Sequence, residues 1–171
     1  MSTLAIRQKL VDIASREVGV VEVPKNSNTG KRVKEYQRAS NLEGTGWPYC
    51  AAFVDWCIMQ WGMDPDVLKA LKKTPAQFES WRPKTAAAFG LEDWGRKKGL
   101  RVLYASNTPE LKTGDIITFD SSHVGIVDTD KDGVIFTIEG NTNEAGGRDG
   151  GGVFAKRRSF GEARRFIRIL N

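Results

Sequence analysis

Three side chains of this sequence are suited to nucleophilic chemistry: the two cysteines, Cys50 and Cys57, and the single histidine, His123. Both cysteines stand in the stretch "GWPYCAAFVDWC", and the rest of the chain has no thiol. A cysteine thiolate attacks an amide carbonyl efficiently when an imidazole beside it takes up and returns a proton. These residue types therefore permit acyl transfer by a Cys–His pair, provided that the fold brings one cysteine to His123.

The two cysteines occupy different places on one helix, which the apolar residues after Pro48 predict from about Cys50 to Trp61. They are seven residues apart. On a helix they lie about 10 Å apart along the axis, whereas a disulfide needs Cα atoms within roughly 7 Å. Cys57 falls in the apolar middle of the helix, where buried thiols are inert. Cys50 falls at the N-terminus, where free N–H groups and the helix dipole favour a thiolate or an oxyanion. Position alone leaves open whether Cys50 is a nucleophile or a core residue.

His123 is the only imidazole that can serve Cys50, and it stands at the start of a predicted strand in "SSHVGIVD". A catalytic histidine also needs a group that orients its ring. The stretch "FTIEGNTN" supplies Glu139 and Asn141 at the end of the next predicted strand. If the strands over 123–129 and 133–139 pair as a hairpin around "DKDG", their open ends bring Glu139 beside His123.

A competing motif in the same region is "DTDKDGVIFTIE", which has the spacing of an EF-hand calcium loop with Asp128, Asp130, Asp132 and Glu139 as ligands. The flanking residues are strand-like, and an extended chain carries Glu139 about 16 Å away from the aspartates. We therefore interpret the segment as a tight hairpin turn and expect no metal site. A structural zinc site is also unsupported, because it needs about four ligands. We expect no cofactor.

The elements that must position these residues divide into helices first and strands afterwards. Helical patterns cover 3–18, 31–40 and 50–61, with further helical pieces in 64–81 and 84–99. Short β-branched stretches follow at 114–120, 123–130, 133–140, 152–159 and 164–170. This order predicts an α+β fold in which N-terminal helices pack on a C-terminal antiparallel sheet of four to six strands. We expect one domain over 1–171, and we assign four tryptophans to its core or to partly buried positions: Trp56, Trp61, Trp81 and Trp94.

The net charge of +5 is concentrated in the segment 150–171, which has six basic residues and one acidic residue. A basic surface suggests an anionic partner, but a solvated strand face explains the same residues. No nucleic-acid motif accompanies them, so we expect no nucleic-acid partner. No apolar run reaches the roughly 20 residues of a membrane span, and the N-terminus lacks a signal-peptide pattern. We expect synthesis in the cytoplasm, no classical export and no membrane insertion.

Three stretches that lie in order along the chain resemble the CHAP family of cysteine peptidases and amidases, relatives of NlpC/P60 in the papain-like group. They are "GWPYCAAFVDWC", "LKTGDIITFDSSHVGIV" and "FTIEGNTN". Upstream, "ASREVGVVEVPKNSNTGKRVKEYQ" is similar to the helix and Asn-rich loop that often precede the catalytic cysteine in CHAP-type cell-wall hydrolases. The resemblance extends from about Ile13 and is weakest over 63–112. It implies a papain-like CHAP fold and a single catalytic domain.

The resemblance also implies roles for individual residues. Cys50 corresponds to the nucleophile, and His123 to the general base and then acid. Glu139 corresponds to the group that orients His123, and Asn141 to a second polar member of the site.

Two aromatic residues flank the predicted nucleophile, and we expect both Trp47 and Tyr49 to line the substrate groove. For the oxyanion we expect the backbone N–H of Cys50 as donor, with Asn28 and Tyr49 as side-chain candidates.

The family resemblance implies peptidoglycan as substrate, cut at the N-acetylmuramoyl-L-alanine amide or within the stem or cross-bridge peptide. The protein then acts on the wall, in the periplasm or outside the cell, as a phage lysin after lysis or as a secreted antibacterial effector with a cognate immunity protein. We expect a monomer. Two alternatives stay open at this point: a cysteine protease or isopeptidase acting on a non-wall substrate, and a non-catalytic wall-binding module.

Overall fold

The computed structural model describes residues 1–171 apart from 43–45, 106–110, 132 and 144–149, and describes the backbone alone at 130 and 131. Within the described residues helices precede strands, as the sequence predicts, and the fold is α+β. The helices are α1 (Thr3–Ser15), α2 (Lys31–Ala39), α3 (Cys50–Trp61), α4 (Pro65–Leu71), α5 (Pro75–Trp81) and α6 (Ala88–Lys97). The strands are β1 (Arg101–Tyr104), β2 (Ile116–Phe119), β3 (His123–Lys131), β4 (Val134–Thr142), β5 (Gly152–Ser159) and β6 (Ala163–Arg168). A short 3₁₀ helix, η2 (Phe160–Glu162), lies between β5 and β6.

The strands form one antiparallel sheet in the order β1-β6-β2-β3-β4-β5. Strands β2 to β5 are neighbours in chain order, as in a meander, but β6 inserts between β1 and β2. The sequence also does not predict β1. This strand has four residues, none of them fully buried, and therefore lacks the apolar alternation by which strands are recognised.

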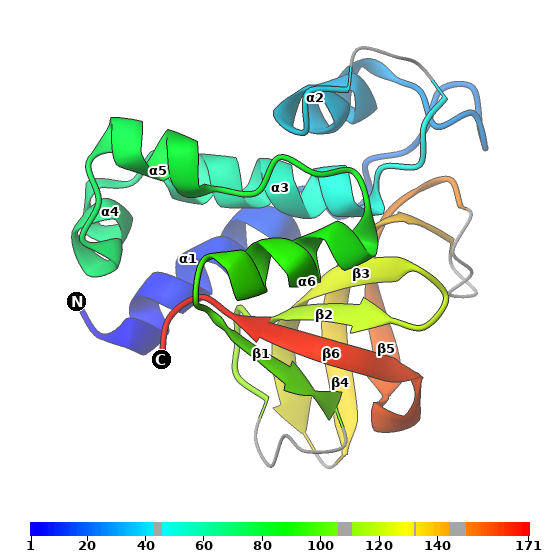
Figure 1. Ribbon diagram of the computed structural model, residues 1–171. Coiled ribbons are helices and arrows are strands. Elements are labelled where there is room, and N and C mark those ends of the chain that lie inside the picture. The colour runs from blue at the N-terminus through cyan, green and yellow to red at the C-terminus, as the bar shows by residue number, and fades with distance from the viewer. Residues whose placement is uncertain (43–45, 106–110, 132, 144–149) are drawn as a thin grey trace.

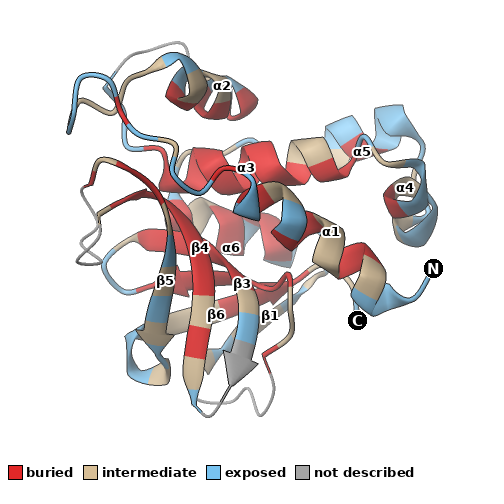
Figure 2. Cartoon of the chain, turned by 180° about the vertical axis from the view of Figure 1, so that it is seen from behind, coloured by how far each residue is buried: buried red, intermediate tan, exposed pale blue. Residues whose placement is uncertain are grey.

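The helices gather on one side of the sheet, with α1, α3 and α6 against it and α4 and α5 farther out (Figure 1). Figure 2 shows that α3 is buried almost throughout, and ten of its twelve residues are buried. The prediction of a buried helix is confirmed. Trp56, Trp61 and Trp94 lie in the core between helices and sheet, and Trp81 packs against it partly buried.

The other face of the sheet has a smaller apolar cluster of its own. Along β2, Ile116 packs against the helices whereas Ile117 and Phe119 point to this second face. Such alternation follows from the two-residue period of a strand. His123 is paired with Phe119 across the two strands, so its side chain points to the same face as Phe119.

A buried charge cluster ties both ends of the chain to the sheet. Asp115, directly before β2, accepts from Arg7 of α1 at 2.7 Å and from Arg168 of β6 at 2.7 and 3.0 Å. All three side chains are at most 7% exposed. Asp115 is the aspartate of the "GDIITFD" stretch, and its contacts give it a structural role.

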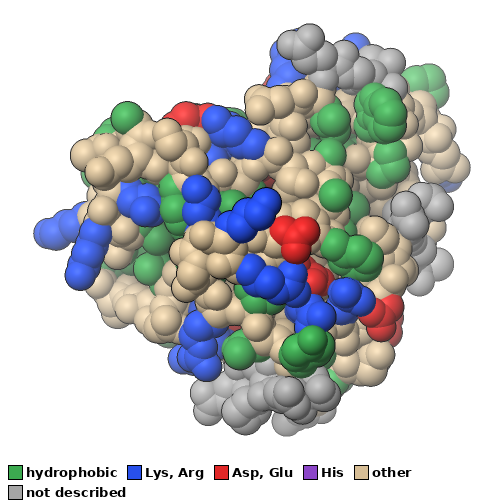
Figure 3. Space-filling view, viewed as in Figure 1, with side chains coloured by type: hydrophobic (Ala, Val, Ile, Leu, Met, Phe, Trp, Pro, Cys, Tyr) green, Lys and Arg blue, Asp and Glu red, His purple; other side chains and the backbone are tan. Residues whose placement is uncertain are grey.

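Four of the five arginines of the basic C-terminal segment are paired with carboxylates from earlier in the chain. Arg164 and Arg165 both bond to Glu92 on α6, and Arg168 bonds to Asp115. On the face shown in Figure 3, Lys and Arg side chains are accordingly interspersed with Asp and Glu. Most of the positive charge of the segment is thus neutralised by carboxylates of the same chain, which weakens the interpretation of the segment as an anion-binding surface.

None of the helices in the described ranges has the length and apolar character that a membrane crossing requires.

Candidate active site

Cys50 is the first residue of α3, and the N-cap residue before it, Tyr49, makes no side-chain capping hydrogen bond. An uncapped helix start leaves backbone N–H groups without intrahelical acceptors at the positive end of the helix dipole. Cys50 has a free thiol and is 5% exposed. The cysteine therefore occupies the predicted position, and its backbone N–H is placed where it can donate to an oxyanion.

The N-terminal half of α3 rests closely on β4 at Gly140. A Cβ added to Gly140 would lie 2.7 Å from Cβ of Phe53, which no side chain tolerates. Close packing thus requires a glycine at this position of the "EGN" stretch, because only a residue without a side chain lets the helix that carries Cys50 approach the strand that carries Glu139.

His123 and Glu139 form a buried hydrogen-bonded pair. Nε2 of His123 lies 2.9 Å from Oε2 of Glu139, and the two side chains are 1% and 0% exposed. The hydroxyl of Thr137 donates to the other oxygen of Glu139 at 2.6 Å. The ring of His123 also stacks on Phe119, with centroids 5.8 Å apart. These contacts fix both the position and the plane of the imidazole.

The strand register differs from the predicted one. Ile126 pairs with Ile138, and continuing this register by one residue puts Glu139 opposite Gly125 rather than opposite His123. An added Cβ at Gly125 would lie 2.6 Å from Cγ of Glu139. Gly125 therefore leaves the space through which Glu139 reaches diagonally to His123, and the predicted proximity results from a different pairing.

The charge states of this pair follow from burial and partners. Burial lowers the pKa of His123, but hydrogen bonding to Cys50 and Glu139 outweighs it and raises the pKa to about 9. Burial raises the pKa of Glu139, but Arg158 and His123 outweigh it and lower the pKa to about 2. The folded site therefore favours an imidazolium beside a carboxylate.

Cys50 lies close enough to the imidazole to contribute to its raised pKa. Nε2 of His123 is bonded to Glu139, and Nδ1 has no hydrogen-bond partner among the described residues, so Nδ1 is the nitrogen that remains for the thiol. This is the arrangement that a Cys–His pair needs for proton transfer. Cys57, in contrast, is completely buried, and burial raises the pKa of its thiol. The prediction that Cys57 is a core residue is confirmed.

The prediction that Tyr49 lines the substrate groove is wrong. Its side chain is 0% exposed and its ring stacks on Tyr36 with centroids 6.0 Å apart. The phenol points into the protein because Tyr49 ends the loop that enters the buried helix α3. Burial, and then the negative charge of Glu22, raise the pKa of Tyr49. Trp47, two residues earlier, is 56% exposed and remains available to a substrate.

Asn141 follows Glu139 by two residues and is 1% exposed, with a left-handed backbone at φ 55°. Its backbone N–H lies near the phenol of Tyr49 and lowers the pKa of that group. Asn28 has its backbone N–H bonded to Glu22 at 2.9 Å, and its side-chain amide donates to Gly46 at 3.3 Å. Of these two asparagines, only Asn141 stands in the strand that carries Glu139.

Sequence reasoning missed Glu22 and Gln37. The amide of Gln37 donates to the backbone oxygens of both Asn28 and Trp47, at 3.0 and 2.9 Å. It thereby ties the loop before α2 to the loop that leads to Cys50. Glu22 is 4% exposed and lies beside Tyr49. A glutamate amid valines in "VVEVP" is the signal that could have identified a buried carboxylate.

The buried polar atoms that lack a hydrogen-bond partner, among the described residues, all belong to this region. They are Oε1 of Glu22, Oε1 of Gln37, the hydroxyl of Tyr49, Nδ1 of His123 and Oδ1 of Asn141. Folded proteins leave few such atoms, and each costs free energy. Two of the five atoms belong to predicted site residues, His123 and Asn141.

The calcium motif is partly outside the described residues, because Asp132 and the side chain of Asp130 are not described. The described backbone makes the flanks of the turn strands β3 and β4, with a left-handed Gly133 at φ 75°. Glu139 is bonded to His123 and Arg158 instead of turning toward the hairpin tip. Within the described residues no cluster of three His, Cys, Asp or Glu side chains could hold a metal ion.

Comparison with protein-family models identifies the family of the chain. The family model for the CHAP domain matches residues 40–141, a span that includes Cys50, His123, Glu139 and Asn141. A search among curated proteins found no match. CHAP domains are typically hydrolases that act on peptidoglycan. Because the model covers more than half of the chain, this protein belongs to the CHAP-domain family.

Proposed function

We propose that this protein hydrolyses an amide bond of peptidoglycan, with Cys50 as nucleophile, His123 as base and acid, and Glu139 as the residue that orients His123. The observation that carries the proposal is the thiol at the start of α3, beside a buried imidazole whose far nitrogen is bonded to a carboxylate. Family membership supports the substrate class. The bond is the N-acetylmuramoyl-L-alanine amide or a peptide bond of the stem or cross-bridge.

In the first half of the reaction, the Cys50 thiolate attacks the amide carbonyl carbon and forms a carbon–sulfur bond. The carbonyl oxygen takes the negative charge, which the backbone N–H of Cys50 stabilises at the positive end of α3. The His123 imidazolium then donates its proton to the amide nitrogen, the carbon–nitrogen bond breaks, and the amine leaves. A thioester on Cys50 and a neutral imidazole remain.

In the second half, water attacks the thioester while His123 takes one of its protons. The carbon–sulfur bond breaks, the carboxylic acid product leaves, and the Cys50 thiolate with its imidazolium partner is restored. Glu139 keeps its charge throughout. Its role is to hold Nε2–H of the ring, so that Nδ1 faces the sulfur in both halves.

Among the aromatic side chains near Cys50, the exposed ring of Trp47 is the one that can contact a substrate.

The biological setting is proposed from the sequence. The enzyme is made in the cytoplasm and reaches the wall either as a phage lysin at lysis or as an antibacterial effector through a specialised secretion route. In the second case, a cognate immunity protein protects the producer. The enzyme acts as a monomer, without a metal ion or cofactor.

The proposal is tested with purified wild-type protein, Cys50→Ala and the matched control Cys57→Ala on purified peptidoglycan. We expect the wild type and Cys57→Ala to release soluble fragments, whose masses identify the bond cut. Cys50→Ala is expected to release none while keeping a wild-type circular dichroism spectrum. A folded Cys50→Ala variant that still digests the wall contradicts the mechanism.

Thiol alkylation separates the two alternatives if the wild type does not digest the wall. Rapid alkylation of Cys50 would then favour a cysteine protease or isopeptidase with another substrate. An inert Cys50 would favour a wall-binding module without catalysis, since only a catalytic site needs a reactive thiol.

A further inference from the structure

The carboxylate of Glu139 has a second buried partner besides His123. Arg158, on β5, donates from Nε to Oε1 at 2.8 Å and from Nη2 to Oε2 at 2.6 Å, so the pair is bidentate. The arginine side chain is 11% exposed and that of Glu139 is 0% exposed. Oε2 is therefore shared between Arg158 and Nε2 of His123.

We propose that Arg158 is a positioning residue of this site, which holds Glu139 in the orientation and charge that keep the Nδ1 side of His123 turned toward Cys50. The inference rests on the proposed Cys50–His123 chemistry. Bidentate guanidinium–carboxylate pairs fix a carboxylate plane as well as its place. With Thr137 also donating to Oε1, the carboxylate of Glu139 has no freedom to turn away from the imidazole.

Arg158 also supports the imidazole from a second direction. Its guanidinium lies over the ring of Phe119, 4.9 Å from the centroid, and that ring stacks on His123. On its outer side Nη1 bonds to Glu162 of η2 at 3.2 Å. The arginine is thus held in place from outside while it contacts both the carboxylate and the aromatic ring that flank His123.

Charge balance gives a further reason for a cation here. In the reactive state Cys50 is a thiolate, His123 is an imidazolium and Glu139 is a carboxylate. These three buried groups together have a net negative charge of one. Arg158 cancels it. Uncompensated charge is costly in such surroundings. The charged groups that face one another are Cys50 of α3, His123 of β3, Glu139 of β4, Arg158 of β5 and Glu162 of η2.

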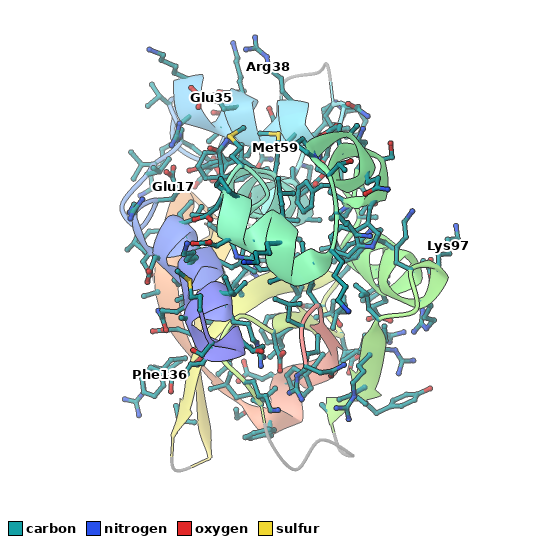
Figure 4. The ribbon with its side chains drawn as sticks, turned by 90° about the vertical axis from the view of Figure 1, so that its left-hand side faces the viewer. Glu17, Glu35, Arg38, Met59, Lys97 and Phe136 are labelled. Carbon is teal, nitrogen blue, oxygen red and sulfur yellow. The ribbon has the colours of Figure 1, made fainter. Side chains whose placement is uncertain are left out.

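The direction of the pH effect follows from these partners. Burial favours protonation of Glu139, and the hydrogen bond from Arg158 is the largest single effect that opposes it. Without Arg158, the pKa of Glu139 rises, so a higher pH is needed to ionise it. The acid limb of activity is then expected at higher pH. The residue directly before Arg158 in the chain, Arg157, lies over the ring of Phe136 and is the matched control for substitutions of Arg158. Phe136 is labelled beside the β3–β4 hairpin in Figure 4.

The first test needs no substrate, because His123 is the only histidine of the chain. Its ring nitrogens are followed by ¹⁵N NMR in the wild type, Arg158→Met, Arg158→Lys and Arg157→Met. Above the titration midpoint we expect the wild type and Arg157→Met to have the proton on Nε2 alone. We expect Arg158→Met to show a mixture of both tautomers, because Glu139 no longer holds one nitrogen.

The second test measures kcat, KM and their pH dependence on soluble peptidoglycan fragments. For Arg158→Met we expect kcat to fall about 10- to 100-fold, the range that is typical of outer partners of the histidines in metal sites. We also expect the acid limb to move upward and KM to change little. Arg158→Lys restores the charge without the two-point bond, so we expect a wild-type acid limb with a reduced kcat.

The two tests also distinguish this inference from the proposed function. If the wild type digests no peptidoglycan, the tautomer experiment still measures whether Arg158 orients His123. A folded Arg158→Met variant with the wild-type tautomer, kcat and acid limb overturns the inference. If Arg158→Met does not fold, Arg158→Lys decides: a wild-type kcat and tautomer for that variant contradict the need for bidentate pairing.

Discussion

His123 and Glu139 meet diagonally across two strands, Nε2 to Oε2 at 2.9 Å, with a glycine in the position directly opposite the glutamate. The diagonal contact turns the imidazole so that one nitrogen is occupied by the carboxylate and the other is left for Cys50. Both side chains are buried, so their protonation is set by each other and by their neighbours rather than by bulk solvent. The pH behaviour of the enzyme should therefore report on this pair.

The first prediction concerns pH. The pKa of His123 is raised to about 9, above its ordinary value of about 6.5. The imidazolium that protonates the leaving amine is therefore present below about pH 9 and is lost as the pH rises through that value. We expect the alkaline limb of kcat/KM near pH 9, with the single histidine titrating at the same midpoint by NMR. An alkaline limb near the ordinary histidine value would contradict the assigned pairing.

The second prediction concerns Gly125. In Gly125→Ala the new Cβ would lie 2.6 Å from Cγ of Glu139 and 3.1 Å from the backbone oxygen of Ile138. The glutamate must move, so we expect a loss of kcat of about 10- to 100-fold, the range that is typical when an outer partner of a histidine in a metal site is disturbed. The control is Gly161→Ala, where the nearest atom is Ser159 Oγ at 3.9 Å. Equal activities of the two folded variants would show that the position of Glu139 is unimportant.

Much of the fold could be predicted from the sequence because its apolar patterns are strong. The order of helices and strands follows from periodicity, and α3 is recognisably a buried helix because it has almost no polar face. The failures have local causes. β1 has only four residues, too few for a two-residue alternation to be recognised. The place of β6 depends on long-range pairing with β1 and β2, which no local pattern encodes.

The site could be predicted as far as residue types and helix position specify it. Cys50, His123 and Glu139 lie close together, as expected. The register in which β3 pairs with β4 differs from the predicted one, because it depends on the bulge after Val127 and on the turn beyond it. Tyr49 looked like a groove residue because it precedes Cys50, whereas its ring is buried against Tyr36. Arg158 stands in a run of basic residues. Which of their side chains point to the face of Glu139 is known only when the pairing of β5 with β4 is known.

The third prediction concerns Trp47, which is 56% exposed and precedes the nucleophile by three residues. If its ring contacts the substrate, Trp47→Ala raises KM and leaves kcat within about twofold, because uniform binding is lost without change at the reacting atoms. Tyr104→Ala is the control, since Tyr104 is equally exposed but stands on β1, at the sheet edge opposite β5. A Trp47→Ala variant with the KM of the control would show that the ring does not contact the substrate.

The fourth prediction separates structural from catalytic carboxylates. Asp115→Asn removes the negative charge between the buried guanidinium groups of Arg7 and Arg168. Breaking a buried ion pair from one side typically costs about 3–5 kcal/mol, so we expect the free energy of unfolding to fall by roughly that amount in urea titrations. Because Asp115 does not contact the His123–Glu139 pair in any hydrogen bond described, the folded fraction should retain wild-type kcat. In the folded fraction of Glu139→Gln we expect a large loss of kcat instead, since the amide cannot serve as the anionic partner of the imidazolium. A loss of kcat in folded Asp115→Asn would instead assign the aspartate a part in the reaction.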